Sequence, residues 1–318
     1  MRWRHTMGAA VAMLALLGGA GRVRAQYNPA AGRSAPMEAQ EQVVRDEEGR
    51  VVARRKVLVK AAPDRYGNAA GNRYDLAVDG AFKGQTIAVL HFYTGEGFDF
   101  ELPRAALKQK GFSVYRWLNG PPTATALRQA LRRACQLWII SGERQLLGPD
   151  HLAVIKEFFA SGKGVYIWGD NEPYYADANY VAKALLGVTM QGNLPGDRVV
   201  RIQATGGGHR VGLLPNHLLT TGLAFLYEGI TIATIQANQT LTPLLFGSAG
   251  NLVASFYDQG GKRAILDGGF TRLYRQWNTA GTGRYIKNAA AWLVNVERRG
   301  KVVTAAGGSP AKTPAQPM

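Results

Sequence analysis

Short apolar runs alternate with amphipathic segments of helical length between residues 86 and 187. The runs are largely uninterrupted by charge, as expected for strands that are covered on both faces of a sheet. Because antiparallel neighbours need only tight turns, longer helical connections indicate parallel pairing with right-handed crossovers. The predicted strands are 86–91, 112–117, 137–140 and 164–168, and the predicted helices are 102–110, 123–134, one that starts at Pro149 and ends before Gly162, and 176–186.

Residues 195–270 have a different pattern, in which apolar stretches are separated by loops and not by helices. We expect strands at 199–203, 230–235, 244–246, 252–257 and 263–266, followed by a last helix over about 281–297. The predicted fold is therefore a three-layer α/β/α sandwich with a doubly wound, mostly parallel sheet and some antiparallel extension.

The N-terminus has the layout of a secretory signal peptide. Arg2 and Arg4 precede an apolar run from Gly8 to Gly21, and residues 23–25 offer a cleavage site after Ala25. The run is shorter than the roughly 20 residues that span a bilayer as a helix. We expect residues 1–25 to be removed and the protein to be exported, periplasmic or secreted, and not transmembrane after signal removal. An uncleaved membrane anchor is the alternative.

Three further regions follow the signal. Residues 26–80 are polar and form a lead segment that we expect to be partly disordered, with a candidate hairpin in which 43–44 and 51–52 flank the turn 46–49. We expect residues 81–299 to form the α/β domain and the Pro-, Ala- and Gly-rich residues 300–318 to form a disordered tail.

The chain carries a formal charge of +16, and the signal contributes four arginines and no acid, so about +12 remains. Outside the cytoplasm the polyanions for such a protein are anionic surfaces and acidic partners, although scattered charge also serves solubility alone. No Lys/Arg block is interleaved with aromatic residues, so no nucleic-acid binding is expected. Cys135 is the single cysteine, which excludes an intramolecular disulfide, and we interpret it as a packing residue.

Polar side chains follow the carboxyl ends of the predicted strands, where ligands bind in doubly wound sheets. Converging carboxylates there could share a proton or hold a hard cation, or they could cap helix N-termini or pair with Arg144 and Arg272. We favour the structural roles. No metal is expected, because the histidines lack zinc-site spacing, and no cofactor, because residues 95–97 lack the third glycine of a dinucleotide fingerprint. The candidate binding cleft comprises His91, Glu96, Ser141, Glu143, Asp170, Asn171, Glu172 and Asp267.

The central part of the chain resembles the class I glutamine amidotransferase-like superfamily, a flavodoxin-like group that includes ThuA-like and sugar-binding-like proteins. The resemblance rests on the order of 87–91, 137–142, 152–159, 164–169 and 266–270. It implies a nucleophile on a turn written G-x-C-x-G.

The matching stretch of this chain is Gly169-Asp170-Asn171-Glu172-Pro173. Asn171 therefore occupies the place of the catalytic cysteine, and the His-Pro-Glu partner is also absent. An amide cannot serve as a thiolate nucleophile, so glutamine hydrolysis is disfavoured.

Two functions from different classes follow. The first is an exported non-catalytic binding or scaffold module of the cell envelope with a degenerate amidotransferase-like site, whose partner is an envelope protein or a carbohydrate ligand. Trp168, Tyr174, Tyr175 and Trp277 would suit sugar stacking, with core packing as the alternative for Trp168. The second is a carboxylate- or metal-dependent hydrolase acting on a carbohydrate or envelope substrate.

Residues 277–284 precede the last predicted helix. Thr279 or Thr282 could cap this helix and leave backbone N–H groups free for an anion. We expect simple capping.

Overall fold

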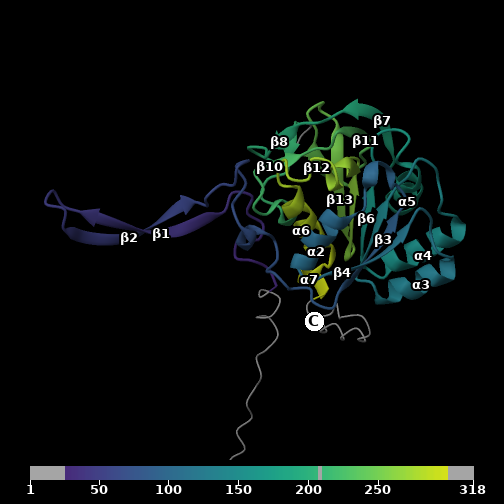
Figure 1. The fold of residues 1–318 in the computed structure, drawn as a ribbon, viewed down its shortest axis with the longest axis horizontal. Coiled ribbons are helices and arrows are strands. Elements are labelled where there is room, and N and C mark those ends of the chain that lie inside the picture. Colours follow the sequence, from purple (N-terminus) through teal and green to yellow (C-terminus); the bar gives the residue numbers. More distant parts are fainter. Residues whose placement is uncertain (1–25, 207–209, 300–318) are drawn as a thin grey trace, which may run out of the picture.

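A computed structural model describes residues 26–206 and 210–299, so the predicted signal peptide and tail lie outside the described residues. Its centre is an eight-stranded sheet in the order β4-β3-β5-β6-β14-β13-β12-β9 (Figure 1). The parallel part consists of β3 (Thr86–His91), β4 (Ser113–Leu118), β5 (Gln136–Ile140), β6 (Gly164–Trp168) and β14 (Lys262–Asp267). The antiparallel extension consists of β13 (Leu252–Gln259), β12 (Thr242–Phe246) and β9 (Gly212–Leu213). The predicted sheet is thereby confirmed.

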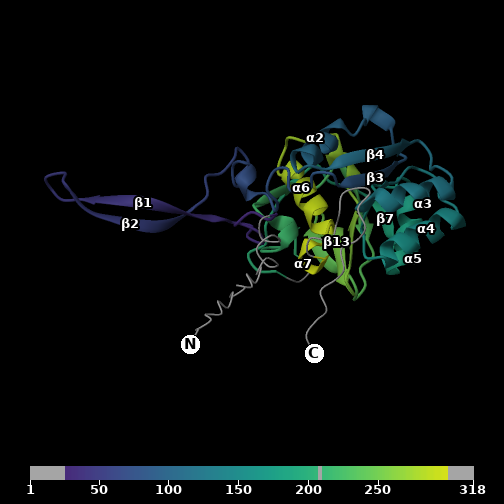
Figure 2. The same ribbon diagram turned by 90° about the horizontal axis from the view of Figure 1, so that it is seen from below.

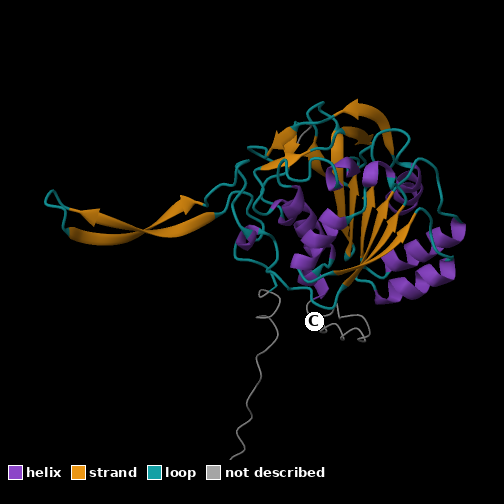
Figure 3. Ribbon diagram, viewed as in Figure 1, coloured by secondary structure: helices purple, strands orange, loops and turns teal. Residues whose placement is uncertain are grey.

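Helices cover both faces of the sheet (Figure 3). The core on one face is built from α3 (Ala124–Arg133), α4 (Pro149–Ala160) and α5 (Ala176–Leu186). The core on the other face is built from α2 (Glu101–Gln109) and α6 (Thr282–Leu293), with α7 (Val296–Arg299) following. Every residue of β5 and β6 is buried, because helices pack on both sides, and this explains their continuous apolar sequence.

The helix ends follow local chemistry. The Thr123 hydroxyl accepts a hydrogen bond from the Ala126 N–H and so caps α3. Gly187 ends α5 at a φ of 71°, a left-handed conformation that a glycine adopts without cost. The last predicted helix is in fact two, because Asn295 takes a φ of 61° between α6 and α7.

The segment from 190 to 235 differs most from the prediction. β8 (Val199–Arg201) and β11 (Thr231–Ile235) do not extend the main sheet. They pair instead with β10 (Phe225–Tyr227) and β7 (Met190–Pro195), which the sequence did not suggest, as two small sheets. In Figure 1 these small sheets lie at the end of the molecule where the parallel strands finish.

The lead segment contains a long antiparallel hairpin, β1 (Met37–Arg45) and β2 (Val51–Lys60), which projects from the domain as an isolated ribbon (Figures 1 and 2). Residues 61–80 are more ordered than expected, because Leu76 and Asp75 are fully buried against the domain. Within 26–206 and 210–299, no helix combines the length and the hydropathy needed to cross a bilayer.

Candidate functional site

The loops that follow the parallel strands lie at the carboxyl ends of these strands, next to the two small sheets of β8 with β10 and of β7 with β11 (Figure 1). Of the candidate residues, His91, Ser141, Asp170 and Asp267 expose none of their surface. Asn171 is half-buried, whereas Glu96, Glu143 and Glu172 are exposed. The candidates therefore divide into a buried set and a surface set, and the buried set meets solvent nowhere in this conformation.

Asp267, the last residue of β14, is the centre of a buried polar network. Its Oδ1 accepts hydrogen bonds from Arg272 Nη2 at 2.9 Å and from the Gly269 N–H at 3.1 Å. Its Oδ2 accepts from the hydroxyls of Tyr285 at 3.0 Å and Tyr166 at 3.4 Å. Burial raises the pKa of Asp267 from its usual range, while Arg272 favours the charged form. The expected pairing of Asp267 with Arg272 is present.

Asp170 lies two residues beyond β6 and binds backbone and hydroxyl donors. Its Oδ2 accepts from the Thr271 N–H at 2.8 Å, at the start of the 3₁₀ turn η4 (Phe270–Leu273). Its Oδ1 accepts from the Asn171 N–H at 2.8 Å and from the Thr231 hydroxyl at 3.3 Å. Burial raises the pKa of Asp170 to about 7, against these donors, which favour the carboxylate. The Asp170 carboxyl group thus links the turn after β6 to η4 and to β11.

Asn171, which the sequence resemblance predicts at the nucleophile's position, is also engaged in hydrogen bonds. Its Oδ1 accepts from the Thr231 hydroxyl at 2.7 Å, and its Nδ2 donates to the Glu172 carbonyl at 2.9 Å. Thr231 belongs to β11, so the small sheet of β7 and β11 is joined directly to this turn. The turn after β6 therefore connects the main sheet to the small sheet of β7 and β11.

Ser141 and His91 have structural partners as well. Ser141 Oγ accepts from the N–H groups of Asp177 and Ala178, at 3.0 and 3.2 Å, in the first turn of α5. His91 Nδ1 lies 3.0 Å from Arg116 Nη1, and its ring packs edge-on to Phe98. Burial, followed by the Arg116 charge, lowers the pKa of His91 to about 4. A histidine with this pKa is neutral at physiological pH.

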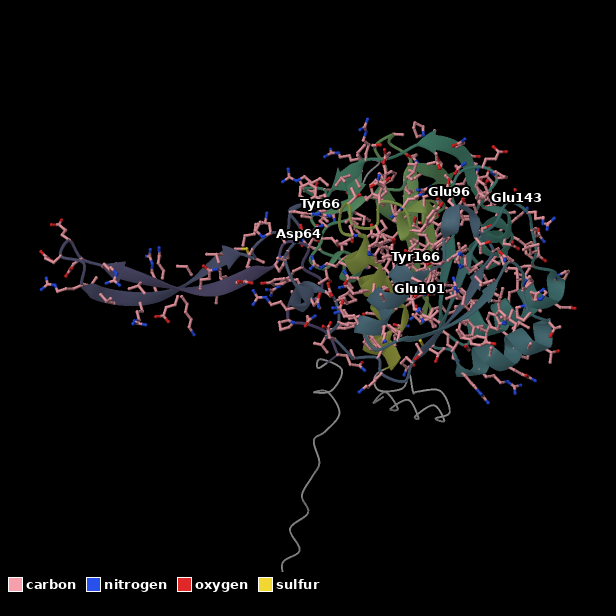
Figure 4. All side chains as sticks on the ribbon, viewed as in Figure 1. Asp64, Tyr66, Glu96, Glu101, Glu143 and Tyr166 are labelled. Atoms are coloured by element: carbon pink, nitrogen blue, oxygen red, sulfur yellow. The ribbon has the colours of Figure 1, made fainter. Side chains whose placement is uncertain are left out.

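Figure 4 places Glu143 on the side of the domain away from the hairpin and Glu96 nearer the middle of the view. Glu96 Oε2 accepts from Arg275 Nε at 3.0 Å and from the Tyr274 hydroxyl at 3.1 Å, and these bonds lower the pKa of Glu96. The Tyr274 hydroxyl also lies 3.4 Å from that of Tyr93. This cluster ties the loop after β3 to the loop after β14.

The aromatic candidates for sugar stacking and the single cysteine lie in different parts of the structure. Trp168 is fully buried, so it packs in the core and cannot stack on a sugar, while Tyr174, Tyr175 and Trp277 keep some exposure. Cys135 is buried next to the start of β5, at the opposite edge of the sheet, and burial raises its pKa to about 12. Among the described residues, no group of three or more His, Cys, Asp or Glu side chains is placed to hold a metal ion.

Sequence reasoning missed the residues that close over the strand ends. The Glu228 carbonyl accepts from Arg272 Nη2 at 2.8 Å, and the Ile230 N–H donates to the Thr271 hydroxyl at 3.0 Å. Both belong to the connection between β10 and β11. No local pattern marks them, because each acts on residues more than 40 positions away.

The sequence matches no protein-family model and no curated protein. Three of the solved structures that resemble part of this chain illustrate the similarity. One is a ThuA-like protein from Parabacteroides merdae, with a TM-score of 0.43 and 11% sequence identity; the similarity covers 67% of this chain and 90% of that one. Another is a GMP synthase subunit from Thermoplasma acidophilum, with a TM-score of 0.39 and 9% identity, covering 67% of this chain and 96% of that one. The third is an exo-β-1,4-mannosidase from Opitutaceae bacterium strain TAV5, with a TM-score of 0.37 and 10% identity, covering 67% of this chain and 36% of that one. The chain thus spans about a third of the mannosidase. Membership of the amidotransferase-like superfamily stays a prediction.

Proposed function

We propose that this chain is an exported, non-catalytic binding or scaffold module of the cell envelope with a degenerate amidotransferase-like site. The observation that carries the proposal is the hydrogen bonding of the turn after β6, which contains Asp170 and Asn171. Asp170 and Asn171 are both held by hydrogen bonds to Thr271, Thr231 and the turn itself. A nucleophile or a general base needs a reachable lone pair, whereas the Asp170 carboxylate exposes no surface and the half-buried Asn171 carries an amide, which is neither a nucleophile nor a base.

The competing function, a carboxylate- or metal-dependent hydrolase, requires carboxylates that face a shared open space. Asp170 and Asp267 are instead dispersed into separate networks, one with backbone N–H groups and one with Arg272 and Tyr285. Neither exposes any surface. This arrangement favours the scaffold over the hydrolase.

The hairpin of β1 and β2 gives such a scaffold a contact surface. An isolated two-stranded ribbon is marginally stable in water and gains from a third strand or a packed face. Val52 and Leu58 are exposed to 60% and 71%, and the outer edges of both strands offer unpaired backbone groups. We therefore infer an envelope protein as the partner, which adds a strand to the ribbon or packs on its apolar side chains.

The experiment that tests the absence of catalysis compares the purified chain with Asp170→Asn and Asn171→Ala. Ammonia release from glutamine and reducing-sugar release from envelope polysaccharide are measured. We expect background rates from all three proteins. Turnover by the parent chain that either substitution removes would overturn the proposal.

The scaffold is tested by placing a photo-crosslinking residue at Val52 on the hairpin and, as a matched control, at the exposed Leu102 on α2. Irradiation of living cells should yield a discrete adduct from the hairpin position alone. Equal yields from both positions, or no adduct from either, would contradict a role of the hairpin in partner contact.

A further inference from the structure

A cavity of about 520 Å³ opens at the N-terminus of α6, beside the base of the hairpin. The residues of its wall that matter here are Arg65, Tyr66, Trp277, Thr282, Arg284 and Lys287. Figure 4 places Tyr66, with Asp64, on the side of the domain from which the hairpin leaves. None of these residues belongs to the strand-end candidates, so the cavity is a separate feature of the molecule.

The N-terminus of α6 is uncapped, contrary to expectation. Its N-cap residue is Gly281, which has no side chain to accept from the first-turn N–H groups. The Thr279 hydroxyl donates instead to Gln276 Oε1 at 3.2 Å. Thr282 is one of the residues that line the cavity, it is only 1% exposed, and its buried hydroxyl has no hydrogen-bond partner. A buried hydroxyl without a partner is costly, and a ligand oxygen would satisfy it together with the free N–H groups.

In the wall of the cavity and directly behind it, cations outnumber carboxylates, although Asp75 itself is one of the lining residues. The Asp75 carboxylate is shared by Lys110 at 2.8 Å, Lys287 at 2.7 Å and Arg284 at 2.8 Å. Lys110 Nζ also lies 2.5 Å from Asp79 Oδ1. The cluster therefore contains three cations and two carboxylates, and its net charge is positive. The positive end of the α6 dipole adds to it. The local field therefore favours an anion.

The rim adds aromatic surface and one charge of each sign. The Trp277 ring lies over Gly283, where a Cβ would approach Trp277 Cζ2 to 3.4 Å. The Arg65 guanidinium lies 4.8 Å from the centre of the Tyr66 ring and donates to the Asn278 carbonyl at 2.7 Å. Asp64, which also lines the cavity, accepts hydrogen bonds from the Tyr66 and Asn68 N–H groups through its Oδ1. Flat, half-exposed aromatic rings beside cations suit a sugar ring that bears an acidic group.

We propose that this cavity is a binding site for an anionic saccharide. The acidic group binds the first-turn N–H groups of α6 and the Thr282 hydroxyl, and the sugar ring packs on Trp277. The site goes beyond the proposed function, because it involves none of the strand-end residues and stands whether or not the protein catalyses a reaction.

The test uses isothermal titration calorimetry on the full chain with a tetrasaccharide of galacturonic acid, its carboxyl-reduced neutral counterpart, and sodium sulfate. We expect the acidic tetrasaccharide to bind, the neutral one to bind at least tenfold more weakly, and added salt to weaken the binding. Equal affinity for both saccharides would overturn the anion requirement. Binding of sulfate without the saccharide, or no binding at all, would overturn the saccharide site.

The matched variants are Thr282→Val and Thr279→Val. The first removes an unpartnered hydroxyl and should keep or raise the melting temperature while it weakens saccharide binding about tenfold, the usual effect of one hydrogen bond to a charged group. The second removes a hydroxyl of the same loop that faces Gln276 and should leave binding unchanged. Equal effects of the two variants would overturn the assignment of Thr282. Trp277→Leu provides a further check, because it should weaken the saccharide more than it weakens sulfate.

Discussion

Arg272 donates to Asp267 at 2.9 Å, and neither side chain exposes any surface. The same guanidinium donates to the carbonyls of Gly269 and Glu228, at 3.0 and 2.8 Å, so it fastens the β10–β11 connection to the end of β14. The Arg272–Asp267 pair therefore explains why loops cover the carboxyl ends of the parallel strands. Asp267, which the hydrolase hypothesis would need as an open carboxylate, instead anchors the loops that cover it.

Replacing Arg272 by methionine should lower the free energy of unfolding by roughly 3–5 kcal/mol, because a buried carboxylate would lose its counter-charge. Urea denaturation followed by far-UV circular dichroism measures the change. Arg275→Met is the control, since Arg275 pairs with Glu96 at the surface and its loss should cost at most about 1 kcal/mol. Similar small losses from both variants would show that the buried pair does not hold the loops.

Cys135 should be inert in the folded protein. Burial raises its pKa to about 12, and only the thiolate is alkylated at an appreciable rate. Iodoacetamide at pH 8 should leave the native protein unmodified and should modify it fully in urea, as read by mass spectrometry. Native alkylation as fast as that of the unfolded chain would contradict the burial of the thiol.

The parallel half of the fold was predictable because each of its signals is local. The run Leu137 to Ile140 is apolar throughout since helices cover both of its faces, and Gly187 ends α5 where a left-handed residue is needed. The pairing of Asp267 with Arg272 was also within reach, because the two residues are five apart. These features depend on short stretches of chain.

The closure of the site was not predictable on the same terms. Strands of three residues, such as β8 and β10, are too short to show a period. Thr231 donates a hydrogen bond to Asn171, 60 positions away in the sequence, and no local pattern near either residue predicts this bond. The sequence therefore indicated which polar residues follow the parallel strands, but not that His91, Ser141, Asp170 and Asp267 would be fully buried.

The carboxyl group of Asp170 should titrate near neutrality, because burial raises its pKa to about 7 from an ordinary value near 4. The protonated form stabilises the folded state below about pH 4, and this contribution is lost as the pH rises toward 7. Relative to Asp170→Asn, the parent chain should lose at most about 4 kcal/mol between pH 4 and pH 7.5.

Urea titrations at several pH values measure the difference between the parent chain and Asp170→Asn, so that the contributions of other groups cancel. Glu172→Gln serves as the control for the removal of one negative charge from the same loop. A carboxyl carbon signal of Asp170 with its midpoint near pH 4 in NMR would refute the raised pKa.

The hairpin should be far less protected from hydrogen exchange than the sheet it projects from. Its strands pair only with each other and carry exposed apolar side chains such as Val52 and Leu58, whereas β5 and β6 are buried on both faces. Local opening of a two-stranded ribbon costs little, so its amides should exchange orders of magnitude faster than those of β5. Mass spectrometry of deuterated peptides measures both regions in one sample. Slow exchange in the hairpin at high dilution would show that the ribbon is stable alone and needs no partner. Slow exchange that disappears on dilution would show that a second copy covers the ribbon, and would replace the envelope protein as its partner.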